Sequence, residues 1–88
     1  MIICVQGRLT EMPKPPQTEK IRRNFIVAVD SNSVPEAEAQ ATQVLTESGY
    51  GFITINQRFS VEKASGDPVM DKIVDEARRD GLAVAIYQ

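Results

Sequence analysis

Two apolar segments near the start of the chain have the pattern of β-strands. Residues 1–7 read MIICVQG, and residues 21–30 read IRRNFIVAVD. In the second segment the apolar side chains alternate between the two faces of an extended strand, with Phe25, Val27 and Val29 on one face and Ile26 and Ala28 on the other. Because both faces are apolar, this strand is expected in the centre of a sheet.

The segment that connects these strands, residues 8–20, is rich in proline and charge. It is much longer than a hairpin turn, so we expect a stiff loop that joins two strands that are not hairpin neighbours. Proline there would lower the entropy of the unfolded loop and prevent its pairing as an extra strand. Pro13 and Pro16 have the PxxP spacing of polyproline ligands, but no basic residue flanks them at the usual offset, which favours a plain strand connection.

Two amphipathic helices are predicted, each with recognisable ends. The first covers residues 34–48, where Ser33 and Glu36 form a capping box and a glycine follows the last turn. The second begins after Asp67, a favourable N-cap, and ends at Gly81. Each helix carries one apolar stripe, so each must cover other parts of the fold.

The remaining segments predict two further strands. Residues 50–63 alternate between apolar and polar positions, with Ile53, Ile55, Phe59 and Val61 on one side, which is typical of a sheet with one covered face and one face in water. A tight turn at residues 56–57 is the alternative, and it would split this run into a hairpin. Residues 82–88, LAVAIYQ, are apolar on both faces and are expected inside the sheet or under a partner chain.

These elements predict one α+β domain over residues 1–88, in the order β-β-α-β-α-β. We expect a four-stranded mixed or antiparallel sheet with the two helices packed on one face. The right-handed connection between strands that flank a helix favours some parallel pairing.

Charge is distributed unevenly along the 88 residues, whose net charge is −2. Five basic against two acidic side chains give residues 1–23 a charge of +3, and five against ten give residues 24–88 a charge of −5. Lys20, Arg22 and Arg23 form the densest basic group, but no aromatic residue stands next to them in the sequence. Direct nucleic-acid binding is therefore not expected.

The residues that most often carry catalysis are scarce in this chain. It has no histidine and one cysteine, Cys4, which lies in an apolar run and is expected to be buried and inert. Carboxylates four residues apart in the second helix have basic neighbours and are expected on its solvated face. We expect no enzyme, no cofactor and no metal site. No apolar run is long enough to span a membrane, and a cytoplasmic protein is expected.

The first helix is the main candidate for a binding surface. No basic residue occurs from Asn24 to Gln57, a stretch that contains several acidic side chains. The predicted partner-binding residues are Glu36, Glu38, Gln40, Gln43 and Glu47. A negative ridge of this kind would complement a protein or ribonucleoprotein complex with a basic surface.

The stretch FIVAVDSNSVPEAEAQATQVL, with a strand, an acidic cap and an alanine-rich helix, resembles segments of small phage-encoded anti-CRISPR proteins. The resemblance covers about a quarter of the chain and assigns no residue roles. It implies an inhibitor that binds a bacterial CRISPR effector in the host cytoplasm and blocks its nucleic-acid surface or its recruitment of a nuclease. The alternative is a homodimeric structural or assembly protein of phage or bacterial origin, which would associate through the face that bears Phe52 or through the last strand.

Overall fold

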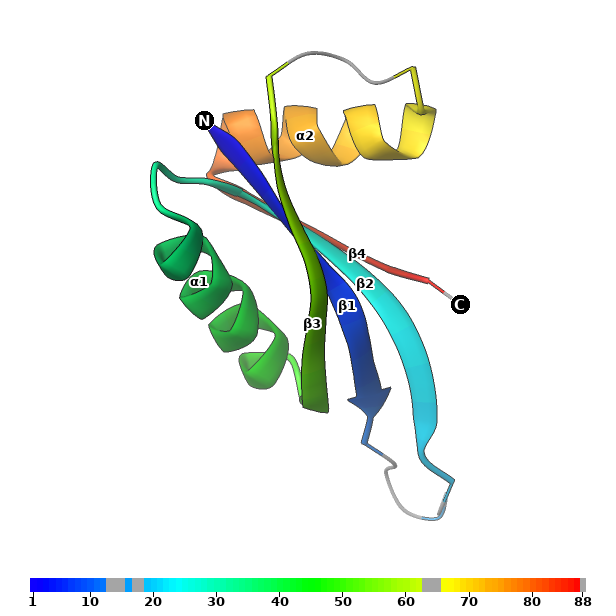
Figure 1. Cartoon of the computed structure of the whole chain (residues 1–88). Coiled ribbons are helices and arrows are strands. Elements are labelled where there is room, and N and C mark those ends of the chain that lie inside the picture. The colour runs from blue at the N-terminus through cyan, green and yellow to red at the C-terminus, as the bar shows by residue number, and fades with distance from the viewer. Residues whose placement is uncertain (13–15, 17–18, 63–65, 88) are drawn as a thin grey trace.

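The computed structural model describes residues 1–12, 16, 19–62 and 66–87, and these form an α+β fold (Figure 1). Its elements in chain order are β1 (Ile2–Glu11), β2 (Ile21–Asp30), α1 (Val34–Glu47), β3 (Tyr50–Val61), α2 (Pro68–Asp80) and β4 (Leu82–Tyr87). The predicted fold class and element order are confirmed.

The four strands form one antiparallel sheet in the order β3-β1-β2-β4. The prediction that β1 and β2 are not hairpin neighbours is wrong, because they pair along their whole length from Ile2 opposite Asp30 to Glu11 opposite Ile21. The predicted loop over residues 8–20 is too long for the same reason, since residues 8–11 belong to β1. Leu9 is buried, and its burial keeps this end of β1 in the sheet. Of the PxxP prolines, Pro13 lies outside the described residues.

The two helices lie on opposite faces of the sheet, so the prediction that both pack on one face is wrong (Figure 1). Against the first face α1 buries Ala37, Ala41 and Leu45, and the sheet contributes Ile3, Val5, Leu9, Phe25, Val27 and Val29. Against the second face α2 buries Ile73, Val74 and Ala77, and the sheet contributes Ile2, Cys4, Ile26, Ala28 and Ala83. The central strands are apolar on both faces, and each apolar face requires a covering element.

β3 is one strand with bulges, and it is not split by a hairpin at residues 56–57. Its register against β1 shifts between Gln6, which faces Gln57, and Gly7, which faces Ile55. The extra residue, Asn56, exchanges the faces of the strand. Ile53 and Ile55 therefore pack in the α1 cluster, whereas Phe59 and Val61 pack in the α2 cluster. The prediction that these four side chains share one side of the strand is wrong.

β4 is an edge strand, so its predicted position inside the sheet is wrong. It pairs only with β2, from Asn24 opposite Tyr87 to Val29 opposite Leu82. Ala83 and Ala85 on one face of β4 pack in the α2 cluster, and Leu82 and Ile86 on the other face pack against the α1 cluster, which accounts for its apolar sequence.

The helix ends carry the predicted caps, but the capping box of Ser33 and Glu36 is only half formed, because the backbone N–H of Ser33 donates to Ser31 Oγ at 3.1 Å instead of to Glu36. The Ser33 hydroxyl accepts a hydrogen bond from the backbone N–H of Glu36, at 3.4 Å. The Asp67 carboxylate accepts from the N–H of Val69 at 2.9 Å and has a second, longer bond in the same turn. Gly81 ends α2 with φ of 91°, a left-handed conformation that costs glycine little.

Candidate functional site

The residues with intrinsic chemical reactivity lie in ordinary surroundings. Cys4 is buried as predicted, and burial raises the pKa of its thiol, which keeps it protonated. On α2, Arg79 donates a hydrogen bond to Asp80 and lowers the pKa of that carboxyl, the opposite of what a general acid needs. Across the described ranges, no three His, Cys, Asp or Glu side chains gather in a way that could hold a metal ion.

Four of the five predicted partner-binding residues form a single stripe on α1. They are spaced three or four residues apart and point away from the sheet, and they are Glu36, Gln40, Gln43 and Glu47. The Gln40 amide donates to Glu36 Oε1 at 3.2 Å, and the Gln43 amide donates to Glu47 Oε1 at 3.1 Å. These bonds join the side chains into two pairs, and α1 itself contains no basic residue that would neutralise them. We refer to these four residues as the α1 stripe.

The fifth predicted residue, Glu38, does not belong to this surface. It is half-buried on the other side of α1 and forms an ion pair with Arg58 of β3. Position 38 is about 140° to 180° around the helix from the four residues of the α1 stripe, because successive residues are about 100° apart. Glu38 therefore connects α1 to the sheet, and its charge is compensated within the chain.

A second surface lies on the α2 side of the sheet, where β1 and β2 extend beyond the helix (Figure 1). Across the strands Arg8 faces Asn24 and Thr10 faces Arg22, and Tyr87 of β4 completes the row of Asn24. We call this surface the open half-sheet and define it by Gln6, Arg8, Thr10, Arg22, Asn24 and Tyr87, with Lys20 and Phe52 at its border.

Hydrogen bonds hold the side chains of the open half-sheet in place. Arg8 donates to Asn24 Oδ1 at 3.4 Å. Arg22 donates to Thr10 Oγ1 at 3.0 Å and to the backbone carbonyl of Phe52 at 2.9 Å. None of these bonds neutralises either guanidinium, because every acceptor is uncharged. Both arginines therefore keep their positive charge available at the surface.

An exposed aromatic ring stands beside these basic groups. Phe52 is 65% exposed and has φ of 48°, an unusual value for a residue other than glycine. The Lys20 ammonium lies 5.2 Å from the centre of its ring, within range of a cation–π contact. The sequence reasoning missed this arrangement, because Lys20 and Phe52 are far apart in the chain. Phe52 lies at a second register shift of β3 against β1, between Thr54, which faces Arg8, and Gly51, which faces Thr10. This shift depends on β1, so the sequence around Phe52 does not indicate it.

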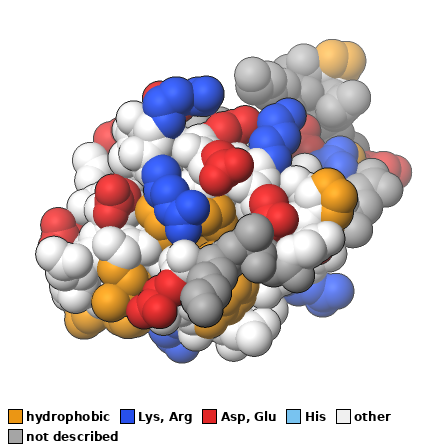
Figure 2. Space-filling view, turned by 90° about the horizontal axis from the view of Figure 1, so that it is seen from above, with side chains coloured by type: hydrophobic (Ala, Val, Ile, Leu, Met, Phe, Trp, Pro, Cys, Tyr) orange, Lys and Arg blue, Asp and Glu red, His pale blue; other side chains and the backbone are white. Residues whose placement is uncertain are grey.

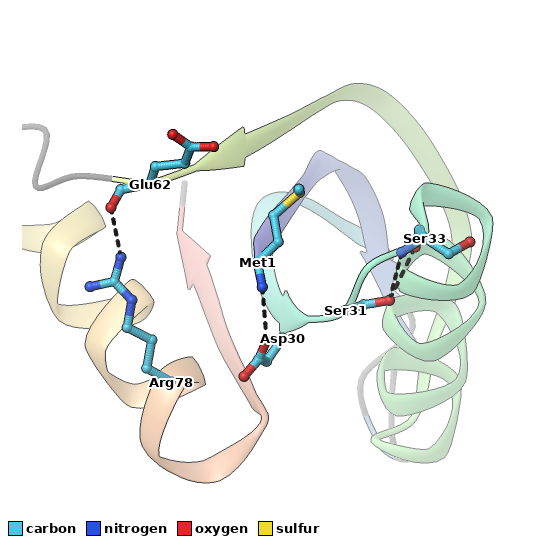
Figure 3. A network of polar contacts seen from close by, with 6 residues as sticks. All are labelled: Met1, Asp30, Ser31, Ser33, Glu62 and Arg78. Carbon is cyan, nitrogen blue, oxygen red and sulfur yellow. Dashed lines mark hydrogen bonds and ion pairs between the residues drawn. The ribbon is translucent and has the colours of Figure 1, made fainter.

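A small hollow lies at the opposite end of the molecule, seen from above in Figure 2. It has a volume of about 290 Å³, and basic, acidic and apolar side chains intermix around it: Met1, Ile2, Asp30, Val61, Glu62 and Arg78. Figure 3 shows that its polar groups bond to one another. The Met1 amino group lies 3.3 Å from Asp30, and Arg78 donates to the Glu62 carbonyl at 3.2 Å. These contacts join Met1 to the end of β2 and α2 to the end of β3. Because basic groups of Met1 and Arg78 intermix with the carboxylates of Asp30 and Glu62, the hollow does not present charge of one sign to a ligand.

An apolar groove follows the boundary between the start of α2 and β4. One part has a volume of about 410 Å³, and its lining includes Val69, Ile73 and Val84. A neighbouring part of about 530 Å³ is lined by Val69, Ile86 and Tyr87, among others. Val69 is 63% exposed, which leaves apolar surface beside the unpaired edge of β4.

Neither a scan against protein-family models nor searches of curated proteins and solved structures find a match for this chain. In the part of the chain that the structure describes, neither helix is long and apolar enough to cross a membrane.

Proposed function

We propose that this chain is a binding protein that acts by contact between the α1 stripe and a protein or ribonucleoprotein complex with a basic surface. The observation that carries the proposal is the outward stripe of two carboxylates and two amides on a helix without basic residues. Complementary charge of this kind accelerates encounter and selects among partners.

The size of the molecule is compatible with such a role. Its accessible surface is 5659 Å². A partner footprint of about 800 Å², usual for one side of a stable complex, would take about a seventh of that area. One side of the molecule centred on α1 is enough for this contact, and the sheet then serves as the rigid support of the helix.

Charge reversal in the α1 stripe tests this function. The double substitution Glu36→Lys and Glu47→Lys should weaken partner binding by about tenfold or more, since repulsion replaces attraction on both turns of the contact. Bacterial CRISPR effector complexes are the first partners to assay, as the sequence resemblance suggests, and affinity is measured by titration calorimetry. A protein captured from a bacterial lysate is purified and assayed in the same way.

The matched control for this test reverses two charges on the other helix, with Asp75→Lys and Glu76→Lys. Both pairs of substitutions change the net charge equally, so a general charge effect would weaken binding in both. The proposal requires a loss only in the α1 variant. Equal affinity of the wild type and the α1 variant, with unchanged circular dichroism, would show that the α1 stripe is not the contact surface.

Self-association is the second candidate function, and the exposed apolar groove beside β4 favours it. Two copies could pair through their β4 edges and continue the sheet from one subunit into the next.

Light scattering over a concentration series should then show a dimer at high concentration. Val84→Lys should shift the equilibrium to the monomer, because lysine on an edge strand opposes pairing. Thr46→Lys on α1 adds the same charge elsewhere and should leave the dimer intact. A monomer at all concentrations contradicts this candidate.

A further inference from the structure

The open half-sheet is a platform that consists of three rows of cross-strand neighbours, which are Gln6 with Ile26, Arg8 with Asn24 and Tyr87, and Thr10 with Arg22. On the α2 side, the row of Cys4 and Ala28 is buried under α2. In the rows beyond it Arg8, Arg22 and Tyr87 are exposed and Gln6 and Asn24 are partly exposed, whereas Thr10, which bonds to Arg22, is buried. From Gln6 to Thr10 the platform extends along the strands for about 14 Å, given about 3.4 Å per residue. Beyond α2 this face of the sheet is not covered by a helix and has room for an extended ligand (Figure 1).

The charge of this platform is positive. Arg8 and Arg22 lie on it and Lys20 lies at its border, whereas the β1 and β2 positions of this face from Gln6 to Thr10 and from Arg22 to Ile26 contain no carboxylate. The carboxylate of Asp67 borders it at the α2 end, where it caps the helix by accepting from backbone N–H groups. A flexible polyanion is the ligand class that this distribution of charge complements.

The aromatic residues narrow the class of polyanion. Phe52 presents an exposed ring at one end of the platform, and Tyr87, held by a 3.0 Å hydrogen bond from Gln6 to its hydroxyl, lies in the row of Arg8 and Asn24. Nucleic-acid bases stack on such rings, and the carboxylates of an acidic peptide do not. Lys20, next to the Phe52 ring, is placed to meet the phosphate of a base stacked there.

We propose that the open half-sheet binds single-stranded nucleic acid. Arg8, Arg22 and Lys20 would contact the phosphates, and the Phe52 ring would be the main side chain on which a base stacks. The expectation of no direct nucleic-acid binding depended on the lack of an aromatic residue beside the basic group, and the fold supplies one from β3. The inference does not rest on the α1 stripe, which lies on the opposite face of the sheet.

Fluorescence anisotropy with labelled oligo(dT) and oligo(rU) of about 12 nucleotides tests the proposal, since single-strand sites usually span about 4–16 nucleotides. The full chain should bind both oligomers saturably at low salt. With three phosphate contacts, the logarithm of the affinity should fall against the logarithm of salt concentration with a slope of about −2. Absence of saturable binding at about 50 mM salt would overturn the proposal.

Variants of the basic residues distinguish binding at the open half-sheet from non-specific electrostatic attraction of the oligonucleotide to the protein. Arg8→Glu with Lys20→Glu should weaken oligonucleotide binding by about tenfold or more and flatten the salt slope. Lys72→Glu with Arg79→Glu on α2 changes the net charge equally and should cost less than about threefold. Equal losses in the two double variants would overturn the site.

Phe52 distinguishes nucleic acid from another polyanion. Phe52→Ala should weaken oligonucleotide binding by about tenfold, and Phe52→Tyr should restore it, because the ring is what the base contacts. An oligoglutamate peptide should bind more weakly than the oligonucleotides and should not respond to Phe52→Ala. If the peptide binds as tightly as the oligonucleotides and Phe52→Ala affects neither, the site recognises acidic protein and the proposal is wrong.

Discussion

Replacing Gly7 by alanine should destabilise the protein by about 3 kcal/mol. A Cβ atom at this position would lie 1.9 Å from the carbonyl oxygen of Thr54 and 3.0 Å from the Cα of Ile55. Both are backbone atoms of β3, which cannot rotate away as the end of a side chain can. The variant must displace β3 or lose the bulge that directs its apolar residues to both cores.

Urea unfolding followed by circular dichroism measures this effect. A chain of this size has a stability of about 4–13 kcal/mol, so the expected loss is a large fraction of the total. Gly51→Ala is the matched control, because its Cβ would meet the Met12 side chain, with the sulfur at 3.1 Å. That exposed side chain can move, and the cost should stay below about 1 kcal/mol. Similar losses in the two variants would show that close approach at Gly7 is unimportant.

Local signals in the sequence were sufficient to predict most elements of this fold. The caps at Ser33, Asp67 and Gly81 depend on residues within one helical turn, and the structure forms each of them. The alternation in β2 also predicted which of its side chains share a face. Where a structural feature is determined by neighbours in the chain, the pattern of residues contains the information.

Features that depend on a partner strand were not predictable in this way. The bulge at Asn56 exists because Gly7 allows β3 to approach β1, and neither residue signals the other in the sequence. Without that bulge, Ile55 and Phe59 would share one face, which is what the alternation predicted. The assignment of the two helices to one face had the same origin, since a sheet with one wet face needs cover on only one side.

The candidate surfaces show the same division. The four residues of the α1 stripe follow from helical periodicity, whereas the ion pair of Glu38 with Arg58 removed one predicted contact residue. The open half-sheet could not be predicted, because Arg22 and Phe52 are 30 residues apart and meet only across the sheet. Long-range pairing thus decides which charged residues are available to a partner.

Replacing Phe25 by alanine should cost about 4 kcal/mol of the free energy of unfolding. Its side chain is fully buried in the α1 cluster, and its residue pairs with Gly7 on one side and Ile86 on the other. Truncation removes apolar area from the largest core and leaves a cavity that the paired strands cannot close. The expected measurement is a lower urea midpoint with an unchanged m-value.

Phe52→Ala is the informative comparison for this loss. Its ring is exposed and belongs to neither core cluster, so stability should change by no more than about 0.5 kcal/mol. The same substitution should nevertheless weaken oligonucleotide binding. Comparing the two variants therefore separates a ring that contributes to stability from a ring that contributes to binding. A loss of stability at Phe52 comparable to that at Phe25 would mean that the ring supports the fold. Its exposure would then need a structural explanation instead of a role in binding.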